Sequence, residues 1–199
     1  MKTIFTTIFA IVVLAVVSNN STFAATTHNG KEVSTTLTNV SRISKIEVHG
    51  NVELYVSDGS ADQVKVYNQY YAESALVQSQ NGVLRISSYK AEKLVVWVTA
   101  NDLRAISAYD NATVKSFGSL SKIEFDIDLN NNATAQLNLD AYKTSLTLND
   151  NAKATLSGSV NEYSLRYADT ASIVNDNFST VNETKTQTSR RNNTDIAVL

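Results

Sequence analysis

Residues 127–156 read IDLNNNATAQLNLDAYKTSLTLNDNAKATL, and this stretch contains the same short pattern twice: alternating apolar residues, an Asp/Asn turn and an alanine. Two more turns fit the same frame. The four turns are Asp110-Asn111-Ala112, Asn131-Asn132-Ala133, Asp150-Asn151-Ala152 and Asp169-Thr170-Ala171. Their alanines are 21, 19 and 19 residues apart, which indicates an internal repeat of about 19 to 21 residues in the second half of the chain.

Two columns of apolar or aromatic residues precede the turns at fixed spacing. The first column is Ile106, Ile127, Leu146 and Leu165, and the second is Ala108, Leu129, Leu148 and Tyr167. Because successive strand side chains point to opposite faces, both columns should be buried on one face. Each unit is therefore predicted to be strand, turn, strand, with equivalent residues stacked on each other.

Asp and Asn recur at the turns because they tolerate left-handed backbone angles and bond the local backbone. We expect Asn132 and Asn151 to use such angles. The predicted turn ladder, which would have a structural role, consists of Asp110, Asn111, Asn131, Asn132, Asp150, Asn151 and Asp169.

This periodicity favours an all-β domain wound as a parallel β-helix, a solenoid with coils of about 19 to 21 residues. A regular antiparallel meander is the alternative fold, because short alternating strands can be wound either way. Upstream, alternating patterns such as Val52, Leu54 and Val56 continue. The turn signals Asp58-Gly59 and Asn81-Gly82 predict hairpins or irregular coils in a more irregular N-terminal half.

The N-terminus predicts export. Residues 1–25 have Lys2, an apolar run over 4–17 and small residues before Ala25, as in a cleaved signal peptide. We expect a polar leader over 26–42, the β-helix domain over 43–179 and a C-terminal cap or tail over 180–199. The mature chain is then predicted to have no membrane span and to be periplasmic, on the cell surface or extracellular.

Composition excludes several classes of function. The chain has no cysteine, so a disulfide framework and thiolate chemistry are excluded. Its formal net charge is −2, which disfavours nucleic acid as a partner. It also has no proline, which suits unbroken sheet ladders.

The order and spacing of several strand segments resemble the GIN domain, the head domain of autotransporter adhesins, a domain of unknown function in exported proteins of Bacteroidetes-type bacteria. The matching segments are residues 46–56, 64–66, 81–86 and 94–106. The resemblance covers about residues 43–175 and implies that the β-helix is right-handed. This chain departs from the family in having Asn101 where proline is frequent, and Asp-Asn-Ala turns where glycines are frequent.

No residue pattern predicts a catalytic, cofactor or metal site. Exposed aromatic residues can stack on sugar rings or anchor a protein interface, so Tyr67, Tyr70, Tyr71 and Trp97 are the candidate ligand contacts. The leading hypothesis is a non-enzymatic exported binding or adhesion module for a glycan, an envelope component or a protein. The alternatives are a structural cell-envelope domain without a defined ligand and, third, a β-helix enzyme acting on polysaccharide.

Overall fold

The computed structural model describes residues 34–37, 40, 42–67 and 75–188. All of them belong to one compact unit, Glu32–Leu199. The expected signal peptide, most of the leader, Tyr70, Tyr71 and residues 189–199 lie outside the described residues.

The described residues form strands joined by turns. The strands are β1 (Ser34–Leu37), β2 (Lys45–Gly50), β3 (Val52–Asp58), β4 (Gln63–Tyr67), β5 (Ala75–Gln80), β6 (Val83–Ser88), β7 (Leu94–Ala100), β8 (Ala105–Ala108), β9 (Thr113–Leu129), β10 (Thr134–Leu148), β11 (Lys153–Ala168) and β12 (Ser172–Thr188). Among these residues no helix is long and apolar enough to cross a membrane.

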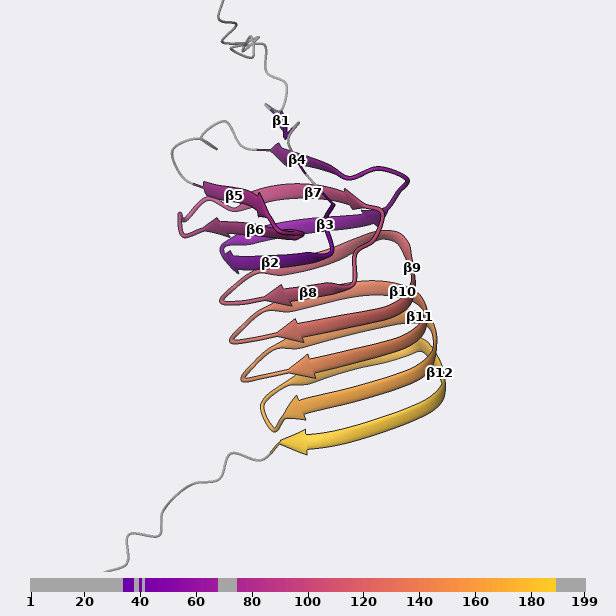
Figure 1. The fold of residues 1–199 in the computed structure, drawn as a ribbon. Coiled ribbons are helices and arrows are strands. Elements are labelled where there is room, and N and C mark those ends of the chain that lie inside the picture. Colours follow the sequence, from indigo (N-terminus) through magenta and orange to yellow (C-terminus); the bar gives the residue numbers. More distant parts are fainter. Residues whose placement is uncertain (1–33, 38–39, 41, 68–74, 189–199) are drawn as a thin grey trace, which may run out of the picture. The chain divides into compact units, whose positions relative to one another are not determined.

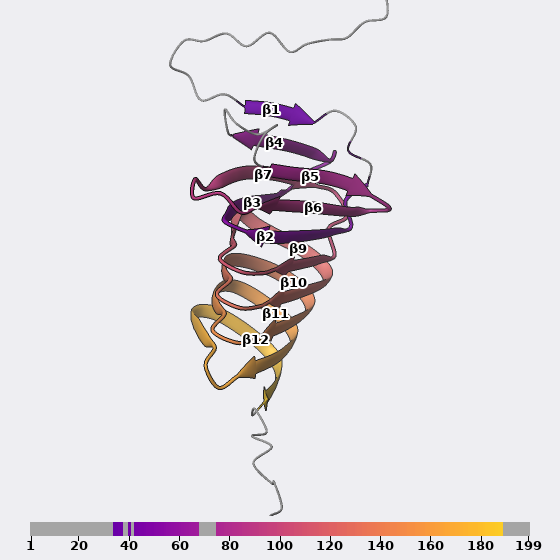
Figure 2. The ribbon, with the colours of Figure 1, turned by 90° about the vertical axis from the view of Figure 1, so that its left-hand side faces the viewer.

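All twelve strands belong to one curled sheet (Figures 1 and 2). Strand β9 joins two rows of strands, because its first residues pair with β3 and its last residues pair with β8. We call β1, β4, β7, β3 and the start of β9 the first layer, and β5, β6, β2, β8 and the end of β9 the second layer. The long strands β10, β11 and β12 then follow β9 in parallel pairs and extend both layers.

The described residues are all-β, as expected, but the expected right-handed parallel β-helix is wrong. The sheet is mixed, because β1 runs antiparallel to β4, β4 to β7 and β5 to β6. One physical cause is the tight turn between β5 and β6, where Asn81 (φ 52°) and Gly82 (φ 81°) adopt the left-handed angles of a two-residue hairpin. The strand order is not sequential either, since β2 lies between β6 and β8 and β3 lies between β7 and β9.

The core lies inside the curled sheet and follows from residue alternation. In β3 and β7 every second residue is buried, beginning with Val52 and Leu94. In the long strands Ile127 is the register partner of both Ile106 and Leu146, and Leu146 is also the partner of Leu165. These four side chains are at most 2% exposed, so they form a buried column.

The Asp/Asn turns are linked from one strand pair to the next by hydrogen bonds. Asn131 Oδ1 accepts a bond from the Asp110 backbone N–H (3.2 Å), and Asp150 Oδ2 accepts one from the Asn131 N–H (3.2 Å). Asn132 Nδ2 donates to Asn111 Oδ1 (3.3 Å). Each bond fixes one turn against its neighbour.

In three of the turns the first Asx residue is left-handed, which is one position earlier than expected for Asn132 and Asn151. Asp110, Asn131 and Asp150 have φ of 60°, 60° and 57°, whereas Asn132 and Asn151 are not among the residues with positive φ. In the last turn Asp169 Oδ1 accepts a hydrogen bond from Gln187 Nε2 (2.7 Å). In the first three turns the first Asx residue therefore has the left-handed backbone angle, and Asn132 and Asn151 are the exposed residues that come next.

The turn geometry gives a prediction for two adjacent residues. Asp150→Val should lower the free energy of unfolding by about 2 kcal/mol, because a β-branched residue is strained at positive φ and the bond to Asn131 is lost. Asn151→Val should cost less than about 0.5 kcal/mol, because its side chain is exposed. Thermal melts of both variants measure the difference, and equal melting temperatures would contradict the assignment of Asp150 as the strained position.

Strand β12 ends the described sheet. It pairs with β11 as far as Thr188, so residues 180–188 belong to a strand. The domain boundaries expected from the sequence remain a prediction. Its residues Glu183 and Lys185 are the register partners of the buried Tyr163 and Leu165 and bind each other (2.9 Å). Charged side chains at such positions discourage the addition of a further strand to an open edge.

Candidate functional site

The outer face of the first layer carries four aromatic side chains close together. They are Tyr55 from β3, Tyr67 from β4, Trp97 from β7 and Phe117 from β9, and we call them the aromatic patch. Tyr55 and Trp97 point outward because their strand neighbours on both sides, among them Leu54 and Val96, are buried. Parallel pairing makes Tyr55 and Trp97 direct partners.

Trp97 is the centre of the aromatic patch. Its ring stacks on Tyr55, with ring centroids 4.7 Å apart and planes 18° apart. Phe117 is tilted against it at 5.2 Å and Tyr67 meets it edge to face at 6.5 Å. Phe117 is 63% exposed, whereas the other three rings are half-buried. The patch therefore offers aromatic surface to a ligand on rings whose orientation is already fixed by neighbours.

A charged group lies beside the rings. Lys115 Nζ is 2.6 Å from Glu53 Oε1 and 5.5 Å from the centroid of the Tyr55 ring, while Tyr55 Oη donates to the same carboxylate (2.9 Å). The hydrogen bond from Lys115 lowers the pKa of Glu53, and the bond to Glu53 raises the pKa of Lys115. Both groups therefore stay charged around neutral pH.

The aromatic patch includes two of the residues predicted from the sequence, Tyr67 and Trp97. Tyr70 and Tyr71 lie outside the described residues. Tyr55 and Phe117 were missed. The segment Leu54-Tyr55-Val56 has the same apolar, aromatic, apolar order as Val96-Trp97-Val98, and this similarity could have indicated Tyr55. Around Phe117 and Gly118 buried and exposed residues no longer alternate along β9, so no periodic pattern indicated Phe117.

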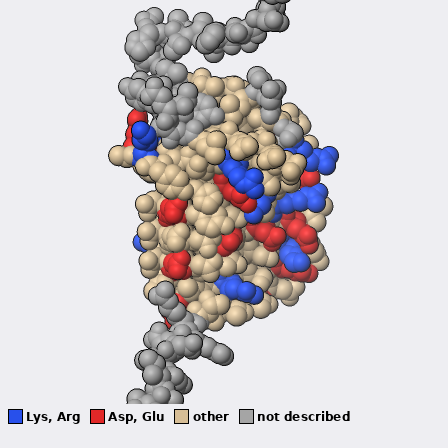
Figure 3. All heavy atoms as spheres, turned by 60° about the vertical axis from the view of Figure 1, so that its left-hand side comes forward, with Lys and Arg blue, Asp and Glu red and all other residues tan. Residues whose placement is uncertain are grey.

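The second layer carries paired charges instead of aromatic rings. Glu47 binds both Lys45 (2.8 Å) and Arg85 (2.9 Å). Beside this group is a shallow hollow of about 700 Å³, whose charged lining residues are Lys45, Asp126, Asp128 and Arg166. Figure 3 shows acidic and basic side chains lying next to each other on the face in view. Within the described part of the chain, no group of three His, Cys, Asp or Glu residues could hold a metal ion.

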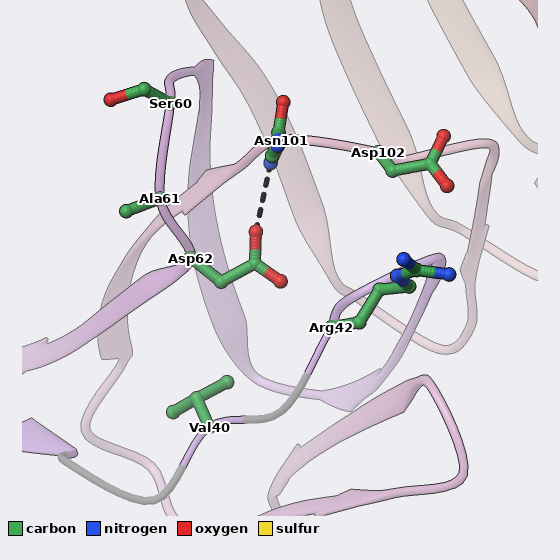
Figure 4. A pocket seen from close by; sticks show the side chains of 7 residues that line it. All are labelled: Val40, Arg42, Ser60, Ala61, Asp62, Asn101 and Asp102. Atoms are coloured by element: carbon green, nitrogen blue, oxygen red, sulfur yellow. Dashed lines mark hydrogen bonds between the residues drawn. The ribbon is translucent and has the colours of Figure 1, made fainter.

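His49 and Asp62 have structural contacts. The ring of His49 stacks on Tyr109, with centroids 4.4 Å apart. Asp62 lines a surface hollow of about 580 Å³ with Arg42 and Asp102. Figure 4 shows its carboxylate accepting the Asn101 backbone N–H (2.8 Å), and the other oxygen accepts the N–H of Ile43 (2.5 Å). Since both oxygens bind backbone, Asp62 fixes two loops to each other.

Known structures share this fold at low sequence identity. The crystal structure of a "putative adhesin from Parabacteroides distasonis" is 17% identical, with a TM-score of 0.59 over 81% of this chain and 80% of that chain. A "putative adhesin from Parabacteroides merdae" is 16% identical, with a TM-score of 0.56 over 81% and 80%. A "putative lipid binding protein" from Parabacteroides distasonis is 12% identical, with a TM-score of 0.61 over 80% and 79%. At these identities the likeness concerns the fold alone.

Comparison with curated proteins gives no match. A family model does match, over residues 42–198, and its description is "Putative auto-transporter adhesin, head GIN domain". This match confirms the resemblance found in the strand segments of the sequence. The chain therefore belongs to the GIN domain family.

Proposed function

We propose that this chain is an exported, non-enzymatic binding domain of the adhesion type, and that its aromatic patch holds a glycan. The observation that carries the proposal is the stacked Tyr55–Trp97 pair with the exposed Phe117 beside it. The apolar faces of sugar rings pack well on aromatic faces, and rings that are already ordered lose little conformational entropy on binding. The adhesin-type family agrees with a binding role and with export.

The lowered pKa of Glu53 supports a binding role for this patch over glycoside hydrolysis. A catalytic acid in a glycosidase needs a raised pKa, so that its carboxyl group carries a proton near neutral pH. The pKa of Glu53 is instead lowered by Lys115. Glu53 thus serves to hold Lys115 and Tyr55 in place.

The proposal predicts that Phe117 contributes to binding and little to stability. The protein would be applied to an array of neutral and acidic glycans, and the affinity for each bound glycan would be measured by calorimetry. Phe117→Ala should weaken binding by about 1 kcal/mol, or about fivefold, because one stacking ring is lost. Its melting temperature should change little, because Phe117 is 63% exposed.

Tyr142→Ala is the matched control, because Tyr142 is also an exposed aromatic residue (54%) but lies on β10, outside the aromatic patch. It should leave the affinity unchanged. If no glycan binds, or if both variants weaken binding equally, the aromatic patch is not the glycan site.

A further inference from the structure

The charges on the aromatic face are predominantly positive. On the outward positions of β3, β4, β7 and the start of β9, the charged residues are Glu53, Lys65 and Lys115. Lys93, immediately before β7, also reaches this face and is 3.8 Å from Glu53. Three lysines thus share this face with one carboxylate, although the whole chain has a formal net charge of −2.

The lysines are aligned with the rings. Strand register places Lys65 beside Trp97, Trp97 beside Tyr55, and Tyr55 beside Lys115. Directly opposite residues on one face of a sheet have Cβ atoms about 5 Å apart, so the four side chains form one row across the first layer. The row has a cation at each end and two stacked rings between them.

The two end cations differ in their partners. Lys115 is 2.6 Å from Glu53, and this contact neutralises it. Among the ion pairs between described residues, none involves Lys65. Lys93 shares Glu53 with Lys115 at the longer distance of 3.8 Å and is 46% exposed. Among the described residues of this face, the single carboxylate of Glu53 therefore does not balance the positive charge of Lys65 and Lys93.

We infer that the glycan held by the aromatic patch is acidic, with carboxylate or sulfate groups on its sugar rings. The inference rests on the proposed function and adds the chemical class of the ligand. A sugar ring packs on Tyr55 and Trp97, and an anionic substituent at its edge meets Lys65 or Lys93. A neutral glycan would use the rings alone and make no ionic contact with Lys65 or Lys93.

The test uses matched ligands that differ only in charge. The full chain is titrated with oligogalacturonate and its methyl ester, with dextran sulfate and dextran, and with polyphosphate, which has charge but no sugar rings. The acidic member of a pair should bind about tenfold more tightly than its neutral member, because its anionic groups contact Lys65 and Lys93. Raising the ionic strength from about 0.1 M to about 1 M shortens the Debye length from about 10 Å to about 3 Å and should remove most of this difference.

Lys65→Gln should weaken binding of the acidic glycan about fivefold and leave binding of its neutral partner unchanged. Lys143→Gln is the control, because Lys143 is 49% exposed and lies on β10, outside the aromatic patch, where it binds Glu124. It should change neither affinity. Thermal melts of both variants check that each one folds.

The outcomes separate this inference from the proposed function. Equal binding of acidic and neutral members would overturn the inference and leave the glycan site standing. Polyphosphate binding as tightly as the acidic glycans would also overturn it, since the rings would then contribute nothing. Binding of no glycan, neutral or acidic, would overturn both.

Discussion

Leu146→Asp is expected to lower the free energy of unfolding by about 4 kcal/mol or more, a large part of the roughly 5 to 15 kcal/mol that is typical of a folded domain. Leu146 is completely buried, and its register partners Ile127 and Leu165 are each only 2% exposed. A carboxylate at this position would be surrounded by apolar side chains, without a partner for its charge. Chemical denaturation or thermal melts measure the loss.

The control introduces the same residue on the outer face of the same strand. Gln136 is exposed on β10 and lies beside Lys115 and Thr155. Gln136→Asp should therefore change stability by less than about 0.5 kcal/mol. Equal stability of the two variants would contradict the assignment of the buried face of β10.

Gly158→Ala is expected to cost about 3 kcal/mol or more. Gly158 has φ of 97°, a backbone angle that favours glycine, and a Cβ atom at this position would overlap the carbonyl oxygen of Leu139 on the neighbouring strand. Because that oxygen belongs to the backbone of a paired strand, it can move only if the pairing of β10 and β11 is disturbed. The measurement is again the free energy of unfolding.

Gly118→Ala separates steric overlap from backbone strain. Gly118 has a similar positive φ of 82°, but a Cβ atom there would have no neighbour within 4 Å. Its substitution should cost only the strain of the left-handed angle, about 1 to 2 kcal/mol. If Gly158→Ala cost no more than Gly118→Ala, close approach of β10 and β11 at Leu139 would be excluded.

The buried faces of the strands could be predicted from the sequence. Alternation in segments such as residues 52–56 assigns each residue to one of two faces, and the structure buries Val52, Leu54 and Val56 accordingly. The spacing of the turns likewise predicts that Ile127 stacks on Leu146, and the two residues are register partners. These inferences depend only on local geometry.

The fold class could not be predicted in the same way. Alternation says which face a residue occupies, but it does not say which strand lies beside it or in which direction that strand runs. Strand β2 pairs with β6 and β8, which are far along the sequence. The hairpin signal Asn81-Gly82 was recognised, but its consequence, an antiparallel edge on the sheet, contradicts a parallel β-helix.

Only part of the candidate site could be predicted, for a related reason. Tyr67 and Trp97 stood out as aromatic residues in a polar sequence. Their contact, however, depends on the antiparallel pairing of β4 with β7, which no local pattern indicates. Phe117 joins the patch only because β9 lies beside β3. Sites that are assembled across several strands require the topology before their members can be named.

Trp97 fluorescence tests the central claim, that the aromatic patch is the glycan site, most directly. The chain has a single tryptophan, so the intrinsic emission on excitation of tryptophan reports on this patch alone. Titration with a glycan that binds in calorimetry should shift or quench the emission and saturate at the same dissociation constant, because the ligand covers a half-buried ring. A glycan that binds in calorimetry while the emission of Trp97 stays constant through saturation would place the site elsewhere and contradict the claim.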